Sequence, residues 1–476
     1  MRVSIIIAFA YLLCYHFVKY MNFFKDKAFL KSVLTIAIPI ALTNLLTSLL
    51  NIVDGIMVAA LPPEIADHAT SAVRIVNQYI FVFQILIFAL CSAACIFISR
   101  YWGKGDKKSI PPVFGFVLII GLIISVVVTI ISISIPDVII SAFVDRSDPI
   151  HALASNYLRV VAISFIPNTI TIVFTFTLRA VKVLRLSVIT SIIAISLNVV
   201  FNYAFMFGKL GMPELGLIGA AWGTVISRAI ETVIVVVCVV LLKYPIIGKF
   251  KDIFSADKAF RSAYFKMLGP VMVNEVLWVI GITVYTMVFA RLPNNETVLA
   301  ATNVTQTMDG LLGVMMIGIG SATGIVIGNT IGSGDIEKAK DYSKKAIGFA
   351  IFAGVLIGSL MFACSYFVPQ LFINLSDASR LSAAKLMRVF GMSQVFRTIN
   401  FVIFIGILRA GGDAKFCMIM EALTMWLIAV PLCLIAGFVF ELEVHNIYLL
   451  IFIEAAIKSV ICFFRVKSGK WLKIFN

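Results

Sequence analysis

The sequence predicts an all-α integral membrane protein whose twelve transmembrane helices form two six-helix lobes. Three observations carry this prediction. Of the 476 residues, 61% are hydrophobic and 13% are charged, whereas an ordinary soluble chain is about 25% charged. Apolar stretches recur along the whole chain, and the second half repeats features of the first. Because the mean hydropathy is +1.05, lipid rather than water must surround most of this protein.

Twelve apolar stretches are long enough to span a membrane, since a spanning helix needs roughly 20 apolar residues. The breaks between them contain residues that end helices, such as Leu-Pro-Pro at 61–63 and Gly-Ser-Gly-Asp at 332–335. The twelve stretches are centred near residues 46, 85, 123, 165, 195, 229, 278, 313, 353, 396, 427 and 455.

Lysine and arginine are concentrated in every second loop, for example at 100–108, 179–185, 338–345 and 409–415. Cytoplasmic loops of membrane proteins carry this excess. We therefore expect a multi-pass protein of the cell membrane with both termini in the cytoplasm. The net charge of +15 would suggest nucleic acid in a soluble protein. Here it is spread over short loops, so we expect the lipid bilayer as a partner and no nucleic acid. The intervening loops hold only Arg146, Lys209, Arg291, Arg380 and Lys385.

The two halves of the sequence resemble each other. Pro39 and Pro270 lie at matching places in the first and seventh spans, and Leu-Arg-Ala occurs at both 178–180 and 408–410. Because each half has six spans and starts on the same side, the halves are expected to be parallel repeats. The expected organisation is an N-terminal extension at 1–20 that precedes the natural start, an N-lobe at 21–243, a cytoplasmic linker at 244–262 and a C-lobe at 263–476.

Charged side chains inside the spans indicate candidate sites, since each costs about 2.5–3.5 kcal/mol to insert. Some have a partner of opposite charge one turn away on the same helix. Arg228 and Glu231 are three residues apart, and Glu454 and Lys458 are four apart. Arg228 and Lys458 are also equivalent in the repeat. Glu421 is expected close to the cytoplasmic end of the eleventh span.

Asp54 and Glu275 have no such partner on their own helix. A desolvated carboxylate exchanges a proton more readily near neutral pH, and with a few oxygen ligands it could instead hold Na⁺. The other interpretation is an interhelical ion pair with an arginine. Asn198 and Asn202, four residues apart in the fifth span, could help to coordinate an ion or could be ordinary interhelical contacts. These four residues are the expected ion-coupling set.

A second group of polar residues is expected to line a substrate cavity. Asp309 and Arg397 also have no partner on their own helix, although an ion pair between helices is the more ordinary interpretation. The complete expected cavity set is Asp309, Arg397, Gln306, Asn77 and Gln78.

Taken in order, these motifs resemble the multidrug and toxic compound extrusion (MATE) transporters of bacteria. The first two spans are similar in Pro39, in Asn-x-x-Asp at 51–54 and in Tyr-Trp-Gly-Lys-Gly-Asp at 101–106. The second half is similar in Ile-Gly-Ser-Gly at 331–334 and in Leu-Arg-Ala-Gly-Gly-Asp at 408–413. The resemblance runs from about Met21 to the C-terminus.

The resemblance implies two lobes around a central cavity and a monomer that exports small amphipathic organic compounds or drugs by alternating access. Antiport of H⁺ or Na⁺ would drive export, with no other cofactor. The first-helix acid of the family falls on Asp54, and the seventh-helix acid of its NorM-like branch falls on Glu275. The DinF-like branch pairs an asparagine with an aspartate in helix five. Here those positions hold Asn198 and Asn202, so the second carboxylate is missing.

Three alternatives stay open. A flippase for lipid-linked oligosaccharides would be favoured by a cavity lined with Arg397 and Arg159, because related folds serve that role. A membrane receptor would bind a ligand without accumulating it. An integral-membrane enzyme is disfavoured, since the sequence has no nucleophile elbow and no metal-ligand spacing. We therefore expect no enzymatic activity.

Overall fold

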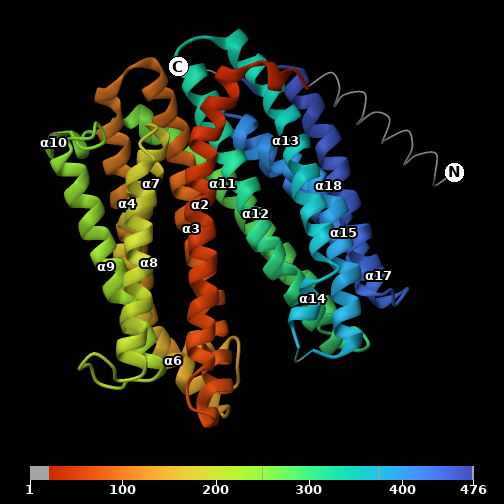
Figure 1. Ribbon diagram of the computed structural model, residues 1–476. Coiled ribbons are helices and arrows are strands. Elements are labelled where there is room, and N and C mark those ends of the chain that lie inside the picture. The colour runs from red at the N-terminus through yellow and green to blue at the C-terminus, as the bar shows by residue number, and fades with distance from the viewer. Residues whose placement is uncertain (1–20, 249, 374, 474–476) are drawn as a thin grey trace. The chain divides into compact units, whose positions relative to one another are not determined.

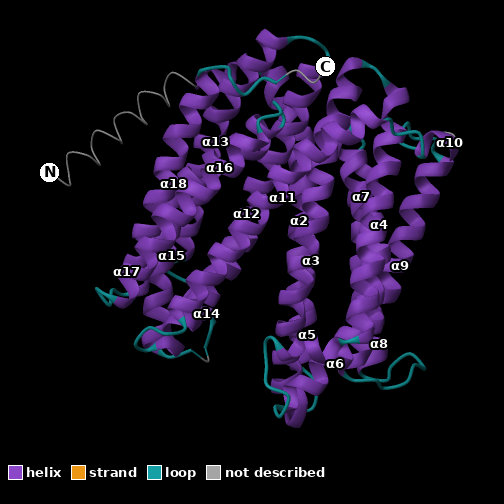
Figure 2. Cartoon of the chain, turned by 180° about the vertical axis from the view of Figure 1, so that it is seen from behind, coloured by secondary structure: helices purple, strands orange, loops and turns teal. Residues whose placement is uncertain are grey.

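The computed structural model describes residues 21–248, 250–373 and 375–473. Every regular element in these ranges is a helix (Figure 2). Twelve helical segments among them are long and apolar enough to cross a membrane. The predicted all-α class and the twelve spans are thus confirmed. The expected extension at residues 1–20 lies outside the described residues.

The N-terminal half begins with the short helix η1 (Met21–Lys25), and α5 (Pro136–Ser141) and α10 (Phe250–Ile253) lie between or after its spans. Two of the spans consist of consecutive helical segments, because a short 3-10 helix precedes or interrupts the α-helix. The six spans are α2 (Lys27–Ala59), α3 (Pro63–Lys104), η2 with α4 (Lys107–Ser109, Ile110–Ser134), α6 with η3 and α7 (Pro149–Val161, Ala162–Ser164, Phe165–Ala180), α8 (Arg185–Met206) and α9 (Leu217–Leu241).

The C-terminal half repeats this pattern, with the short helix α14 (Val368–Leu371) between two spans. Two spans contain π-helical segments, η4 and η5, and such segments often occur near functional sites. The six spans are α11 (Lys258–Phe289), α12 (Asn295–Gly332), α13 (Ile336–Cys364), α15 with η4 (Asp377–Phe401, Val402–Arg409), α16 with η5 and α17 (Ala414–Thr424, Met425–Ala429, Val430–Phe438) and α18 (Val444–Lys467).

The repeated Gly-x-Gly-Asp motif makes the same turn in both halves. Gly105 and Gly334 have φ values of +78° and +84°, which glycine adopts without steric cost at the end of a helix. The following aspartates then cap the next helix. Asp106 accepts a hydrogen bond from the Ser109 amide at 3.3 Å, and Asp335 accepts one from the Lys338 amide at 3.1 Å. The sequence repeat is therefore also a repeat of local structure.

The chain forms two compact units, visible in Figure 1 by their colours. Unit 2 is Leu42–Leu268, and unit 1 contains the described residues before Leu42 together with those from Gly269 onward. Each has its own apolar core. In unit 1 the core includes Phe289 and Phe390; in unit 2 it includes Val76 and Leu158.

Helices within a unit approach closely where glycine removes a side chain. Gly324 on α12 lies against the backbone of η4, since a Cβ there would be 3.1 Å from the Ile405 carbonyl oxygen. From the other side, a Cβ on Gly406 would be 3.0 Å from the Gly320 carbonyl oxygen. Small residues at such crossings replace side-chain packing with backbone contact, which is common between membrane helices.

Two helices belong to both units. The division falls within α2 just after Pro39 and within α11 just before Pro270. A proline inside a helix removes one backbone hydrogen bond and favours bending. Residues 21–41 therefore belong to unit 1 and residues 263–268 to unit 2, which differs from the lobe limits expected at 21–243 and 263–476. The physical reason is that each of these continuous helices packs first with one unit and then with the other.

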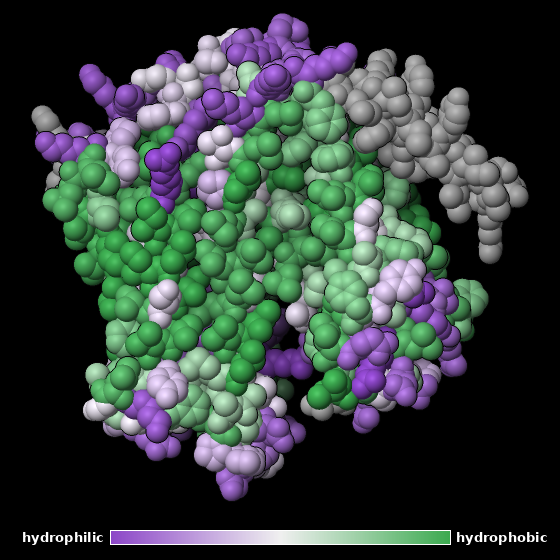
Figure 3. Space-filling model, in the orientation of Figure 1, coloured by the Kyte–Doolittle hydropathy of each residue, from purple (hydrophilic) through white to green (hydrophobic). Residues whose placement is uncertain are grey.

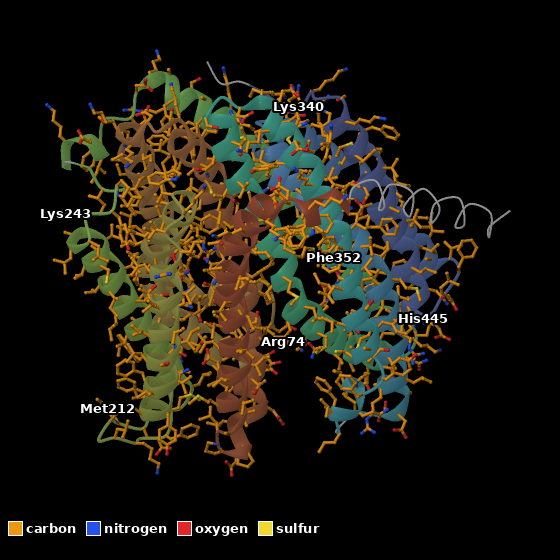
Figure 4. The ribbon with its side chains drawn as sticks, turned by 45° about the horizontal axis from the view of Figure 1, so that its top comes forward. Arg74, Met212, Lys243, Lys340, Phe352 and His445 are labelled. Carbon is orange, nitrogen blue, oxygen red and sulfur yellow. The ribbon has the colours of Figure 1, made fainter. Side chains whose placement is uncertain are left out.

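The surface of the helices matches a bilayer environment. Figure 3 shows apolar residues covering the middle lengths of the helices, with polar residues gathered at their ends. In unit 2, Met212 and Lys243 lie beyond opposite ends of α9; in unit 1, Lys340 near the start of α13 and His445 at the start of α18 lie toward opposite ends of the unit (Figure 4). Within each unit, the basic loops thus lie at one end of the spans, as the alternation of charge predicts.

Candidate functional site

The first candidate site surrounds Asp54 on α2, in unit 2. Asn202 on α8 donates a hydrogen bond from Nδ2 to Asp54 Oδ1 at 2.8 Å. The same nitrogen donates to Asn198 Oδ1, one turn earlier on α8, at 3.1 Å. Because Asn198 and Asn202 are four residues apart, both amides lie on one face of the helix. The structure therefore brings together three of the four residues expected to couple an ion.

Helix α9 completes this site. Asn198 Nδ2 lies 3.3 Å from both Thr224 Oγ1 and Ser227 Oγ. Asn202 is buried, and its Oδ1 has no hydrogen-bond partner among the described residues. Opposite this oxygen is Gly223, where an added Cβ would overlap Asn202 Oδ1. The missing side chain at this position thus makes room for the amide.

Arg228 supplies positive charge to the same site. Its Nη1 lies 2.8 Å from Glu231 Oε2 on the same helix, which confirms the pair expected from their spacing. The guanidinium also attracts the Asp54 carboxylate electrostatically. One arginine therefore faces two carboxylates, which leaves one negative charge in excess when both are ionised.

Glu275 on α11 forms an interhelical ion pair in unit 1. Arg409 Nη2, at the end of η4, lies 2.7 Å from Glu275 Oε1. Arg409 is buried, and its Nε and Nη1 have no hydrogen-bond partner in the described part of the chain. Sequence reasoning assigned Arg409 to a basic cytoplasmic loop and so did not anticipate this partner. The recurrence of Leu-Arg-Ala at 178–180 and 408–410 was the available signal that this arginine has a structural position.

Lys458 on α18 joins two carboxylates in unit 1. Its Nζ lies 2.5 Å from Glu454 Oε1, which confirms the pair expected one turn apart, and 3.0 Å from Glu421 Oε2 on α16. Thr424 Oγ1 donates a further hydrogen bond to Glu454 Oε1 at 2.7 Å. The third member, Glu421, was expected only at a helix end and not as a partner of Lys458.

Asp309 and Arg397 neutralise each other. The arginine donates two hydrogen bonds to the two oxygens of Asp309, at 2.6 and 2.7 Å, a geometry that fixes both side chains. Gln394 Nε2 donates a third at 2.6 Å, and Arg397 lies over the ring of Phe390 at 5.4 Å. This is the interhelical ion pair that the sequence offered as the more ordinary interpretation.

The remaining expected cavity residues are exposed within their own units. Asn77 and Gln78 on α3 are exposed in unit 2, and Gln306 on α12 is exposed in unit 1. Gln306 also hydrogen-bonds Tyr448. Exposed carboxamides in the middle of apolar spans are costly against lipid, so they indicate a polar environment beside these helices.

Twelve spans in two related halves, with paired charges inside the spans, define a polytopic membrane transport protein. The chain belongs to the MatE family, whose model matches residues 39–204 and separately residues 270–435, more than half of the chain. The two matches have the same length, which confirms the internal repeat. The predicted MATE resemblance is confirmed, and because members of this family are transporters, the expectation of a transporter rather than an enzyme is confirmed too.

Relatives match over most of their length. The Probable multidrug resistance protein NorM of Thermotoga maritima is 23% identical over 444 residues, 93% of each chain. The Uncharacterized transporter YisQ of Bacillus subtilis is 24% identical over 455 residues, 94% of this chain and 96% of that one.

Solved structures share the fold. A transporter of the MOP superfamily from Pyrococcus furiosus has a TM-score of 0.84 at 19% identity, covering 93% of this chain and 97% of that chain. An outward-facing multidrug resistance MATE family transporter also has a TM-score of 0.84, at 18% identity and the same coverage. At these identities the likeness concerns the fold alone.

Proposed function

We propose that this protein exports amphipathic organic compounds or drugs across the cell membrane in exchange for H⁺, by alternating access. The observation that carries the proposal is Asp54, a carboxylate inside a spanning helix that is held by Asn202 on a second helix. The names of the relatives, several of them multidrug resistance proteins, support the substrate class. The fold of the family supports a monomer that acts on a small molecule in a bilayer.

Protonation of Asp54 would change how α2 contacts α8. The ionised carboxylate accepts the hydrogen bond from Asn202, whereas a protonated carboxyl also becomes a donor. Asn202 shares its nitrogen with Asn198, which contacts α9, so the change would extend to a third helix. A proton that binds one arrangement of these helices more tightly would shift the population toward that arrangement, which is the requirement for coupling.

H⁺ is the preferred coupling ion, with Na⁺ as the alternative. Na⁺ is a hard cation that needs several oxygen ligands, but Asn202 presents a nitrogen donor to Asp54. Arg228 would also repel a second cation near the carboxylate. A proton needs neither coordinating oxygens nor space. Glu275 is a weaker candidate, because Arg409 already neutralises it.

Substrate contacts are proposed for the exposed carboxamides Asn77, Gln78 and Gln306. Aromatic or apolar groups would supply the rest of the binding energy for an amphipathic compound. Asp309 and Arg397 would shape the cavity without giving it net charge, since each is bound by the other. Arg397 is therefore not free to hold the phosphate of a lipid-linked oligosaccharide, which weakens the flippase alternative, and Arg159 lies 3.8 Å from Asp137.

The test is efflux of ethidium from proteoliposomes under an imposed pH gradient or an imposed Na⁺ gradient. We expect the pH gradient alone to drive ethidium movement against its own gradient. Asp54→Asn, which keeps the size of the side chain and removes its proton exchange, should abolish this coupled movement.

Two results would overturn the proposal. Coupled efflux in Asp54→Asn at the wild-type rate would exclude Asp54 as the coupling group. Movement driven by Na⁺ alone would replace H⁺ by Na⁺. Glu64→Gln, a neutralised acid at the exposed start of α3, serves as the matched control and should transport like the unmodified protein.

A further inference from the structure

Lys458 is shared by two carboxylates of the spanning helices, the buried Glu421 and the partly buried Glu454. The side chains of Lys458, Glu421 and Glu454 are 10%, 7% and 13% exposed. A single ammonium can balance only one carboxylate, so the ionised trio carries one excess negative charge. An uncompensated charge in a water-poor environment is strongly unfavourable. The trio would therefore be more stable with one carboxylate neutralised.

In the part of the chain that the structure describes, Lys458 is the one cation that forms an ion pair with Glu421 or Glu454. Glu275 and Arg409 cancel each other in their own ion pair. Two further nitrogens of Arg409 are buried without a hydrogen-bond partner among the described residues, and none of its printed contacts is to Glu421 or Glu454. The other titratable groups that act on the trio are Glu275 and Tyr285 on α11, Cys417 on α16 and Cys462 on α18.

By the internal repeat of the sequence, this trio is equivalent in position to part of the Asp54 site in the other half. Lys458 is equivalent to Arg228, and by the same offset Glu454 is equivalent to Thr224, a member of the Asp54 site. Arg228 likewise faces two carboxylates, Glu231 and Asp54. Each half thus has one cation and two carboxylates around the same pseudo-symmetric position, built from different residues.

We propose that Glu421 and Glu454 together bind one proton and form a second proton site in the C-terminal half of the chain. The proton comes from a hydronium ion, whose O–H bond breaks to leave water, and it forms one O–H bond on a carboxylate oxygen while the other carboxylate keeps its ion pair with Lys458. The site takes a proton and excludes a metal cation, because the ammonium already lies between the two carboxylates and would repel Na⁺.

Binding of this proton would change the contact between α16 and α18. A proton on Glu421 weakens its attraction to Lys458, whereas a proton on Glu454 lets that side chain donate to Thr424, from which it accepts a hydrogen bond in the structure. Helix α16 continues directly into the π-helical segment η5 after Thr424. The site is therefore placed where one change of charge acts on two spans. Its role in transport rests on the proposed exchange with H⁺, but its ability to bind a proton does not.

The experiment is a potentiometric titration of the purified full-length protein in detergent, without substrate, between about pH 5 and pH 9. The protein is compared with Glu421→Gln and with Glu454→Gln, each of which leaves a balanced pair with Lys458. We expect the unmodified protein to bind about one more proton than either variant over this range. Glu337→Gln removes an 85% exposed carboxylate. Its titration curve should differ from that of the unmodified protein only at the acidic end of the range.

Superimposed titration curves of the unmodified protein and both variants would overturn the proposal. Should a variant not fold, the infrared spectrum of the unmodified protein gives a second measurement. It should contain a protonated carboxyl band at neutral pH that disappears at high pH, and its absence would also overturn the proposal. A proton bound in the titration without ethidium transport driven by pH would refute the proposed function and leave the site in place.

Discussion

At the scale of single residues, the Asp54 site depends on Gly223, whose lack of a side chain leaves room for Asn202. Asn202 fits between α8 and α9 because Gly223 has no Cβ, and its Nδ2 then reaches both Asp54 and Asn198. The amide is held by contact on one side and by hydrogen bonds on the other. A small change of volume at Gly223 should therefore affect the position of an amide that contacts the proposed coupling carboxylate.

Gly223→Ala is expected to lower the stability of the protein by about 1–3 kcal/mol, the usual cost of overpacking a well-packed contact. Its Cβ would overlap Asn202 Oδ1. The measurement is the thermal unfolding midpoint of the purified protein in detergent, together with ethidium efflux driven by a pH gradient.

The control for this change is Gly313→Ala on α12, where nothing lies within 4 Å of the added Cβ. Alanine favours a helix over glycine by up to about 1 kcal/mol, so the control should be as stable as the unmodified protein or slightly more so. Equal thermal unfolding midpoints of Gly223→Ala and Gly313→Ala would show that the contact with Asn202 does not contribute to stability.

At the scale of elements, the segment after α18 folds back on the loop before α16. Trp471 is fully buried and packs against Gly411, where a Cβ would overlap the indole. The Lys473 amide donates to the Gly411 carbonyl oxygen at 2.8 Å. Asp413 forms ion pairs with Arg465 Nε at 2.8 Å and Lys473 Nζ at 2.6 Å. The C-terminal segment thus connects the ends of two spans of unit 1.

Trp471→Ala should destabilise unit 1 by about 3–5 kcal/mol, as expected when a large buried side chain is truncated. The thermal unfolding midpoint in detergent measures this effect. Lys470→Ala, on the exposed neighbouring position, should leave the midpoint unchanged. A loss of stability no greater than that of Lys470→Ala would mean that the segment is not part of the core.

The short helix η1 is attached to α13 by aromatic contacts and one ion pair. The ring of Phe24 lies 5.3 Å from that of Phe352 (labelled in Figure 4), and Phe23 lies 5.6 Å from Phe349. Asp26 Oδ2 lies 2.6 Å from Lys345 Nζ. Hydrogen bonding to Lys345 and to the Phe29 amide lowers the pKa of Asp26 below its ordinary value of 3.8.

The lowered pKa predicts how this attachment depends on pH. A carboxyl whose pKa is lower in the folded state stabilises the fold fully above its ordinary pKa and loses that contribution as pH falls through the folded value. Asp26→Asn should therefore cost a few tenths to about 1 kcal/mol at pH 7. The difference from the unmodified protein should shrink as pH falls below the ordinary pKa of 3.8 and through the lowered one, as measured by chemical unfolding at pH 7 and in acid. An equal difference in the free energy of unfolding at both pH values would show that the ion pair does not stabilise the fold.

At the scale of the whole molecule, the distribution of charge sets the expected orientation in the membrane. The segments around Lys243 and Lys340 are basic, whereas those around Met212 and His445 are not. Within each unit these two kinds of loop lie at opposite ends of the spans (Figure 4). From the positive-inside rule we propose that the basic ends, and both termini, lie in the cytoplasm.

Single cysteines at these positions test the orientation. In intact cells, a membrane-impermeant maleimide should label Met212→Cys and His445→Cys, whereas Lys243→Cys and Lys340→Cys should react only after lysis. The unsubstituted protein gives the background of the native cysteines, which are buried or partly buried among the described residues. The reverse pattern of labelling would place both termini outside the cytoplasm.

Much of the fold follows from local sequence. The number of spans, their approximate centres and the internal repeat depend on runs of apolar residues and on recurring turns such as Gly-x-Gly-Asp, which need no long-range information. Asp54 was recognised for the same reason, because a carboxylate inside an apolar stretch stands out by itself. The pairs Arg228–Glu231 and Glu454–Lys458 follow from helical spacing alone.

The partners between helices were decided only by the tertiary structure. Sequence reasoning left Glu275 and Asp309 without assigned partners, treated Arg409 as a loop residue and treated Glu421 as part of a helix end. Packing joins Glu275 to Arg409, Asp309 to Arg397, and Glu421 to Lys458. The physical reason is that helical periodicity fixes which face a side chain occupies but not which helix lies opposite that face. The sequence determined which charges enter the membrane, and tertiary packing decided which of them are balanced.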